Sequence, residues 1–238
     1  MARRRGRARR MSGREAYKRP FDLLLLVFVL VLLSPLWLVL GLAIALAIRL
    51  DDGGPVLFRQ ARLGRAGRVF EILKFRTMAV DAEERFGPRW AAWNDRRATR
   101  AGRVLRRFHL DEAPQVVNVL RGEMSLVGPR PERPGRAERI SRSVPGFPER
   151  LVVRPGIAGL AQARGGHDLD PRDKLRYDRL YIEAMSPGLD LRLCAACLAR
   201  ALRASPSRAG RGWAARADRR SVPSDHDPAG VGGSQTGG

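Results

Sequence analysis

Residues 23–48 read LLLLVFVLVLLSPLWLVLGLAIALAI, a run of 26 residues without a charged side chain. Only Ser34-Pro35 and Gly41 interrupt its apolar character. An α-helix rises about 1.5 Å per residue, so this run is longer than the roughly 30 Å hydrocarbon core of a bilayer requires. The apolar region of a cleaved signal peptide is shorter, about 7–15 residues. We therefore predict that the segment is embedded in a membrane.

The charges on both sides of this segment indicate its path. Residues 2–19 carry nine Arg or Lys and one acid, Glu15, and further basic residues follow the segment from Arg49 onward. The positive-inside rule therefore favours the cytoplasm for both ends. Pro35 removes a backbone donor and clashes with the preceding turn, so a break in the helix is expected there. We predict a re-entrant helix hairpin over residues 18–49, with a tilted spanning helix as the alternative.

The composition of the 238 residues excludes several classes of protein. A mean hydropathy of −0.28 excludes a polytopic membrane protein, and the residue usage excludes fibrous proteins. Cys194 and Cys197 provide neither a disulfide framework nor a Cys/His metal set, which favours a reducing compartment. The net charge of +21 attracts nucleic acid, anionic lipid or a phosphorylated substrate. However, 42 arginines against 3 lysines also indicate biased codon usage, so the total charge decides little.

The chain after the apolar segment has the pattern of a small mixed α+β domain without internal repeats. The expected elements are a β-hairpin formed by Val56–Arg59 and Val69–Phe75 around Gly64–Gly67, a short basic amphipathic helix over Thr99–Phe108, a helix over Pro114–Leu120 ended by Gly122, a strand over Met124–Val127, and helices over Pro171–Met185 and Leu191–Ala204. Residues 133–149 are expected to form a Pro- and Arg-rich loop with about one helical turn. The basic helix suits a membrane surface or, equally, a solvated face.

Two adjacent acids, Asp111 and Glu112, precede Pro114. Because proline is tolerated in the first turn of a helix, both acids are expected at a helix N-terminus, where the dipole and free N–H groups favour negative charge. The same position suits a bound phosphate, which an ionised carboxylate can attack while its neighbour holds Mg²⁺. Ordinary helix capping explains most acidic pairs of this kind. Chemistry at this pair therefore needs support from other residues.

Four basic residues are candidates for binding a substrate phosphate. Arg130 lies between two prolines, so the backbone that carries its guanidinium is rigid, which suits bidentate recognition of phosphate. Lys74 and Arg76 alternate along the second expected strand and should share one face of it. Arg106 belongs to the basic helix. Each of these side chains is also compatible with a solvated surface.

The motifs, taken in order from Lys18 to Ala204, resemble the monotopic phosphoglycosyl transferases, the bacterial sugar transferases that start capsule, exopolysaccharide, O-antigen and glycoprotein glycans. The resemblance rests on KRPFD (18–22), the apolar segment with Ser34-Pro35, GPVLFRQ (54–60), KFRTM (74–78), LDEAPQ (110–115), MSLVGPRP (124–131) and PGIAG (155–159). These motifs correspond to the catalytic unit of the family and not to the large N-terminal membrane region of its longer members.

The resemblance implies a ping-pong reaction. Asp111 would attack the β-phosphate of a UDP-sugar and release UMP, and a polyprenyl phosphate would then accept the sugar phosphate. Glu112 would hold the cofactor Mg²⁺, and Arg130 would lie beside the phosphates. Ser34-Pro35 matches the break in the membrane helix of the family, which places both chain ends and the active site at the cytoplasmic face of the inner membrane. Expected partners are a UDP-sugar, polyprenyl phosphate and anionic lipid, and no nucleic acid.

The composition predicts a disordered arginine-rich arm over residues 1–17 and a disordered tail over 205–238, both outside the family pattern. Between them, the resemblance implies the re-entrant membrane helix over 18–49 and a cytoplasmic catalytic domain over 50–204. The sequence departs from the family pattern at His109, Ala113 and Ala158. None of these positions carries a charged catalytic group. A membrane-tethered nucleic-acid protein is the alternative from another class, but no helix-turn-helix, zinc or RNA-stacking motif accompanies the charge. A non-catalytic scaffold is the third, and the intact acidic pair argues against it.

Overall fold

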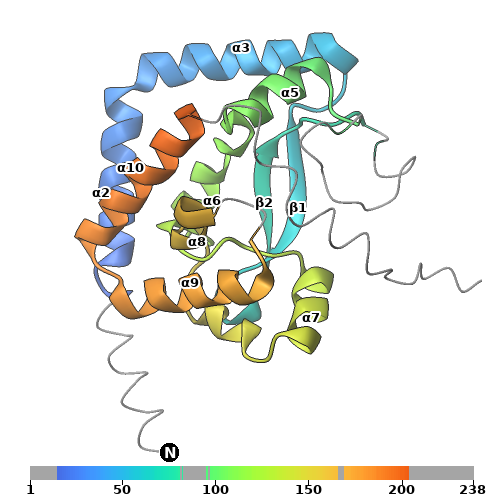
Figure 1. Cartoon of the computed structure of the whole chain (residues 1–238). Helices are drawn as coiled ribbons and strands as arrows, with labels where there is room; N and C mark the ends of the chain where they lie inside the picture. Colours follow the sequence, from blue (N-terminus) through green and yellow to red (C-terminus); the bar gives the residue numbers. More distant parts are fainter. Residues whose placement is uncertain (1–14, 81, 83–94, 96, 166–168, 204–238) are drawn as a thin grey trace, which may run out of the picture.

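The computed structural model describes residues 15–80, 82, 95, 97–165 and 169–203 (Figure 1). The tail predicted for 205–238, and all but the last three residues of the arm predicted for 1–17, lie outside the described residues. Helices dominate the described part, and two small two-stranded sheets accompany them. The predicted α+β class is therefore confirmed.

The apolar segment forms two helices, α2 (Lys18–Leu32) and α3 (Ser34–Asp52). Leu33 separates them with φ −106° and ψ 19°, and Pro35 lies in the first turn of α3, where its missing N–H is tolerated. Figure 1 shows α3 leaving the end of α2 in a new direction along the top of the molecule. By length and composition α3 could cross a membrane, and most of it is exposed. α3 ends at Gly53, whose φ of 71° is the left-handed conformation that glycine adopts easily.

The predicted β-hairpin is confirmed, with a longer first strand than expected. Strand β1 (Leu57–Leu63) pairs antiparallel with β2 (Val69–Phe75), and a 3-10 turn, η1 (Arg65–Gly67), joins them. A second, parallel pair consists of β3 (Ser125–Val127) and β4 (Gly156–Ala158). β3 lies within the expected strand, whereas β4 was not predicted because three residues punctuated by glycine give no periodic signal.

Two short helices flank the acidic pair, as predicted. Helix α5 (Arg100–Arg107) begins at Thr99, whose side chain caps the N–H of Gly102, and α6 (Gln115–Arg121) ends at Gly122 in the left-handed conformation. The 3-10 turn η2 (Leu110–Glu112) lies between them. Helix α5 packs on α3 through Leu105, Ile44 and Ile48. The acidic pair is thereby connected to the apolar helix.

The prediction of a loop over residues 133–149 is wrong. Helix α7 (Pro134–Ser143) occupies most of it, and the 3-10 segment η3 (Phe147–Val152) follows. Ala137, Ile140 and Val144 are buried against Phe147 and Leu175. These contacts stabilise a helix whose proline- and arginine-rich composition is that of a loop. A further short helix, α8 (Leu160–Gly165), follows β4.

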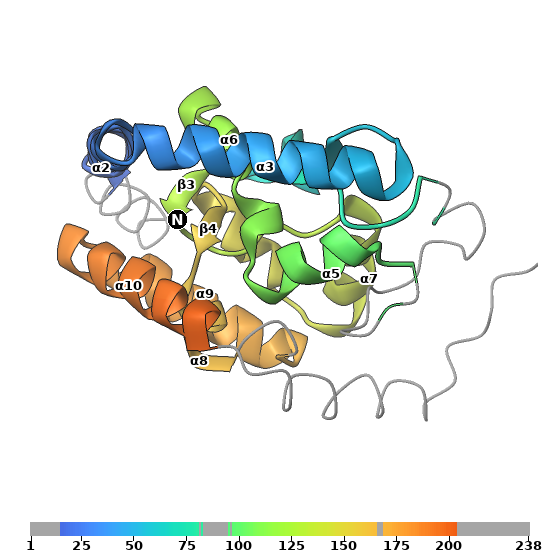
Figure 2. The same ribbon diagram turned by 90° about the horizontal axis from the view of Figure 1, so that it is seen from above.

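Two longer helices complete the domain, α9 (Pro171–Ala184) and α10 (Pro187–Arg203). Both were predicted, although α10 begins four residues earlier than expected. Tyr181, Ile182 and Leu193 from these helices pack on Val127 and Ala158 of the parallel strands. Figure 2 shows α3 along one side of the molecule, α9 and α10 along the other, and β3 and β4 between them.

Candidate active site

The acidic pair lies in a turn of its own rather than at a helix N-terminus. Asp111 and Glu112 belong to η2, and α6 begins only at Gln115. The predicted supply of free backbone donors is also reduced, because the N–H of Glu112 donates to the carbonyl of His109 and that of Ala113 to Leu110. Side chains, rather than the helix terminus, therefore compensate most of the negative charge.

Lys74 and Arg130 provide that compensation. Lys74 Nζ lies 2.7 Å from Glu112 Oε1 and 3.8 Å from Asp111 Oδ2. The Arg130 guanidinium binds Glu112 through both terminal nitrogens, with Nη1 3.1 Å from Oε2. β2 supplies the lysine, and the Pro129–Pro131 loop after β3 supplies the arginine. Among the described residues, two cations therefore hold Glu112, whereas Asp111 has one distant ion-pair partner and remains the more available carboxylate.

Burial and neighbouring charges shift the pKa values of Asp111 and Arg130. Burial raises the pKa of Asp111, Lys74 lowers it, and the neighbouring charge of Glu112 raises it, so that the pKa ends above its ordinary value. Burial would lower the pKa of Arg130, but the charge and hydrogen bonds of Glu112 outweigh burial and raise it. Arg130 is thus a permanent cation in the site.

The structure does not bring Arg76 to the acidic pair through any described contact. Strand β2 ends at Phe75, so the alternation that predicted a shared face with Lys74 stops one residue too early. The Arg76 guanidinium is instead buried, binds both carboxylate oxygens of Asp52 and donates from Nε to the carbonyl of Pro55 at 2.6 Å. The Arg76 side chain therefore connects the end of α3 to the end of the β-hairpin.

Arg106 lies in the last turn of α5, five residues before Asp111. Its charge is one of the influences that lower the pKa of Asp95; the hydrogen bond from Arg97 is the largest. The phosphate contact of Arg106 stays a prediction.

The donor set fits a magnesium ion. Within the described residues no three His, Cys, Asp or Glu side chains gather into a metal site. Mg²⁺ does not require such a cage, because it is commonly bound through one or two carboxylates together with substrate phosphates and water. Glu112 and Asp111 supply that number of carboxylates.

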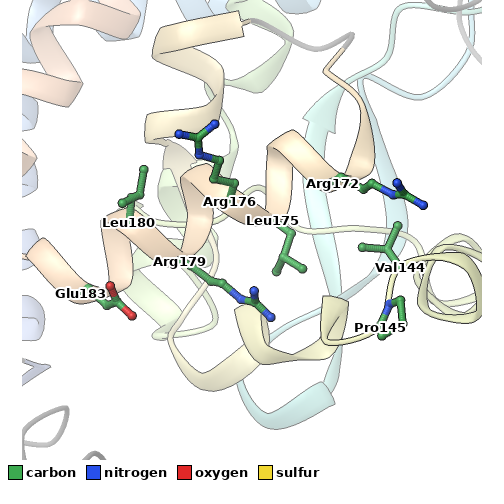
Figure 3. A pocket seen from close by; sticks show the side chains of 8 residues that line it. All are labelled: Val144, Pro145, Arg172, Leu175, Arg176, Arg179, Leu180 and Glu183. Atoms are coloured by element: carbon green, nitrogen blue, oxygen red, sulfur yellow. The ribbon is translucent and has the colours of Figure 1, made fainter.

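A cleft of about 470 Å³ lies elsewhere, between α9 and the residues that follow α7. Figure 3 shows Arg172, Arg176 and Arg179 around it, with Val144 and Leu175 among its apolar lining. Arg179 Nε is 3.1 Å from Glu149 Oε2. Neither acid of the pair lines this cleft, so it is not the candidate active site.

Two arginines beside the site were not singled out from the sequence. Arg62 donates to the carbonyl of Pro131, and Arg150 to the carbonyl of Arg130. Both lie far from the loop in sequence, and nothing in their local motifs distinguishes them from the other arginines of the chain.

The model of the family described as bacterial sugar transferase matches residues 13–204. This chain belongs to that family. It is 42% identical to a UDP-N-acetylgalactosamine-undecaprenyl-phosphate N-acetylgalactosaminephosphotransferase of Aeromonas hydrophila over 177 residues, which cover 73% of this chain and 41% of that protein. It is 43% identical to an undecaprenyl-phosphate glucose phosphotransferase of Komagataeibacter xylinus over 184 residues, which cover 74% of this chain and 34% of that protein.

A third relative has a more similar length. The exopolysaccharide production protein PSS of Rhizobium leguminosarum bv. phaseoli is 39% identical over 184 residues, which cover 74% of this chain and 90% of that protein. The chain thus spans less than half of the first two relatives and corresponds to most of the third. The part shared with all three contains the acidic-pair site.

Proposed function

We propose that this sugar transferase moves a sugar-1-phosphate from a UDP-sugar to a polyprenyl phosphate and releases UMP. The observation that carries the proposal is the Asp111–Glu112 pair, in which one carboxylate is held by two cations and the other remains available. The names of the relatives support the two substrates, because both contain undecaprenyl phosphate and one contains UDP-N-acetylgalactosamine. The reaction is the first membrane step in the synthesis of a bacterial polysaccharide or glycoconjugate.

In the first half-reaction an Asp111 carboxylate oxygen attacks the β-phosphorus of the UDP-sugar. A bond forms between that oxygen and phosphorus, the bond from phosphorus to the bridging oxygen breaks, and UMP leaves with the electron pair. In the second half-reaction a phosphate oxygen of the polyprenyl phosphate attacks the same phosphorus and Asp111 is released. Lys74 and Arg130 neutralise charge on the phosphates, as preorganised cations do in phosphoryl transfer. Mg²⁺ held by Glu112 would supply Lewis-acid neutralisation.

The placement of the apolar segment suits a lipid substrate. At the start of α2, Lys18 Nζ donates to the carbonyl of Val127 at 2.8 Å and to Asp190 at 2.9 Å. At the end of α3, Asp51 Oδ2 accepts from the N–H of Ala101 at 2.7 Å. Both ends of the segment are therefore fastened to one folded domain, which a helix with its ends on opposite faces of a bilayer cannot achieve. This supports a re-entrant hairpin with the domain on the cytoplasmic face of the inner membrane.

The test is UMP release in nanodiscs with Mg²⁺, polyprenyl phosphate and a panel of UDP-sugars. Asp111→Asn should lower the rate at least about a thousandfold, because it removes the nucleophile. Asp173→Asn, an exposed acid in the first turn of α9, is the matched control and should retain the wild-type rate.

Intact-protein mass spectrometry adds a direct readout. Without polyprenyl phosphate, the wild-type protein and Asp173→Asn should gain the mass of one sugar phosphate, and Asp111→Asn should not. UMP release at the wild-type rate by Asp111→Asn would refute the assignment of the nucleophile. A folded wild-type protein that releases UMP from no donor in the panel would contradict the proposed reaction.

A further inference from the structure

The loop that carries Arg130 depends on donors from other parts of the chain. It contains Pro129 and Pro131, which have no N–H and whose rings fix φ. All four carbonyls from Pro129 to Glu132 nevertheless have donors. The N–H of Gly156 donates to Pro129 at 3.0 Å, and the N–H of Leu63 to Glu132 at 2.9 Å. The donors to the other two carbonyls, those of Arg130 and Pro131, are side chains.

Arg150 donates to the carbonyl of Arg130. Its Nη2 lies 2.8 Å from the carbonyl oxygen of Arg130, and its Nε is 2.8 Å from Asp178 Oδ2. The guanidinium also stacks on Phe147 at 4.9 Å and lies 3.6 Å from Glu132. Arg150 is 3% exposed, so this donor has little freedom to move.

Arg62, which comes from another part of the fold, donates to the carbonyl of Pro131. Its Nη1 lies 3.0 Å from the carbonyl oxygen of Pro131, and its Nη2 binds Gln60 Oε1 at 2.6 Å. Burial lowers the pKa of Arg62, and the positive charge of Arg130 lowers it further, which agrees with its position beside the loop. Arg62 comes from β1 and Arg150 from η3, so the loop is fixed between two elements.

We infer that Arg62 and Arg150 are positioning residues that hold the backbone of Arg130 and Pro131, so that the Arg130 guanidinium meets Glu112 and the substrate phosphates. The inference rests on the proposed function for its effect on rate. Neither arginine has a described hydrogen bond or ion pair with the acidic pair, and the charge of Glu112 is one of the smaller influences on the pKa of Arg62. We therefore expect both to act mainly through Arg130. Lysine cannot replace them, because one ammonium lacks the fork that binds a carbonyl and a second partner at fixed angles.

The first test is hydrogen exchange of the full chain in nanodiscs without substrate. Arg62→Lys and Arg150→Lys should each accelerate exchange at least about threefold in peptides covering residues 127–136, because local opening costs less when a carbonyl loses its donor. Peptides from α6 should keep wild-type exchange, which shows that the variant is folded. Arg179→Lys, whose partner Glu149 lies outside the loop, is the matched control and should leave the loop unchanged. Wild-type exchange of the loop in both variants would overturn the inference, whatever reaction the protein catalyses.

The second test is a double-mutant cycle on UMP release. Each Lys variant should lower kcat about ten- to a hundredfold, with a smaller change in KM, because displacements near 1 Å at a positioned group have effects of this size. Arg130→Lys should lower the rate as well. In the Arg130→Lys background the further loss from Arg150→Lys or Arg62→Lys should shrink to about twofold or less, because residues that act as one unit are non-additive. Full multiplication of the two losses would contradict action through Arg130.

Discussion

At the scale of single residues, the carboxyl of Asp111 combines burial with opposing charges. Burial raises its pKa and Lys74 lowers it. Under the proposed reaction Asp111 must be ionised, so UMP release should fall as the pH falls through this raised pKa. Lys74→Met removes the charge that lowers the pKa, and the acid limb of the profile should therefore move to higher pH. The measurement is kcat/KM for UMP release between pH 4.5 and 8.

Lys74→Arg separates charge from geometry in the same experiment. It keeps a cation near both acids but changes its shape, so the rate should fall while the acid limb stays close to its wild-type position. An acid limb that is the same in wild type, Lys74→Met and Lys74→Arg would show that the limb does not report Asp111.

At the scale of elements, α5 lies close to the chain that leaves the β-hairpin because Gly102 of α5 has no side chain. A Cβ on Gly102 would lie 2.1 Å from the carbonyl oxygen of Thr77, which is backbone and cannot rotate away. Gly102→Ala should therefore destabilise the protein by about 1–3 kcal/mol, as overpacking does, although alanine favours helix. Gly188→Ala in α10 is the matched control, since a Cβ there meets open space and should stabilise by up to about 1 kcal/mol. Denaturation midpoints in detergent measure both, and an equal response of the two variants would contradict the close packing.

The elements that could be predicted from the sequence are those whose signal is local. The hairpin, α5, α6, α9 and α10 each show periodic apolar residues bounded by turn or cap residues, and all were located within a few positions. Helix α7 was missed because Pro134, Gly135 and several arginines obscure the spacing of Ala137 and Ile140. Its stabilising contacts include Leu175 of α9, a residue so distant in sequence that the local pattern cannot indicate it.

The candidate site divides in the same way. Asp111, Glu112 and Arg130 stand in short motifs that could be read directly, and Lys74 follows from strand alternation. Arg76 was misplaced because alternation holds only while the strand continues. Arg62 and Arg150 could not be found, because they meet the loop across 69 and 20 residues of sequence. Only the packing of β1 and η3 on the loop distinguishes them from 40 other arginines.

At the scale of the whole molecule, the apolar surface is concentrated on two helices that are joined at a corner. Leu24, Phe28 and Val31 of α2 and Leu38, Leu42 and Leu46 of α3 are all exposed. Contiguous exposed apolar surface of this kind marks a site of interaction with a membrane or another protein, and the proposed lipid substrate favours the membrane. The ends of these helices, by contrast, carry Lys18 and Asp51, which bind the folded domain. The molecule therefore combines an exposed apolar corner with a folded domain that binds both of its ends, as the proposed contact with a bilayer requires.

This arrangement predicts that residue 12 and the catalytic domain lie on the same side of the inner membrane. In a chain with Cys194→Ser and Cys197→Ser, single cysteines are introduced by Ser12→Cys, before α2, and by Glu138→Cys, on the exposed face of α7. A membrane-impermeant maleimide added to spheroplasts should label neither cysteine, and after permeabilisation it should label both. A spanning helix places the two cysteines on opposite sides, so one of them would react in intact spheroplasts. That result would overturn the re-entrant helix hairpin. It would also show that the contacts at the two ends of the apolar segment do not keep both ends on one face of the membrane.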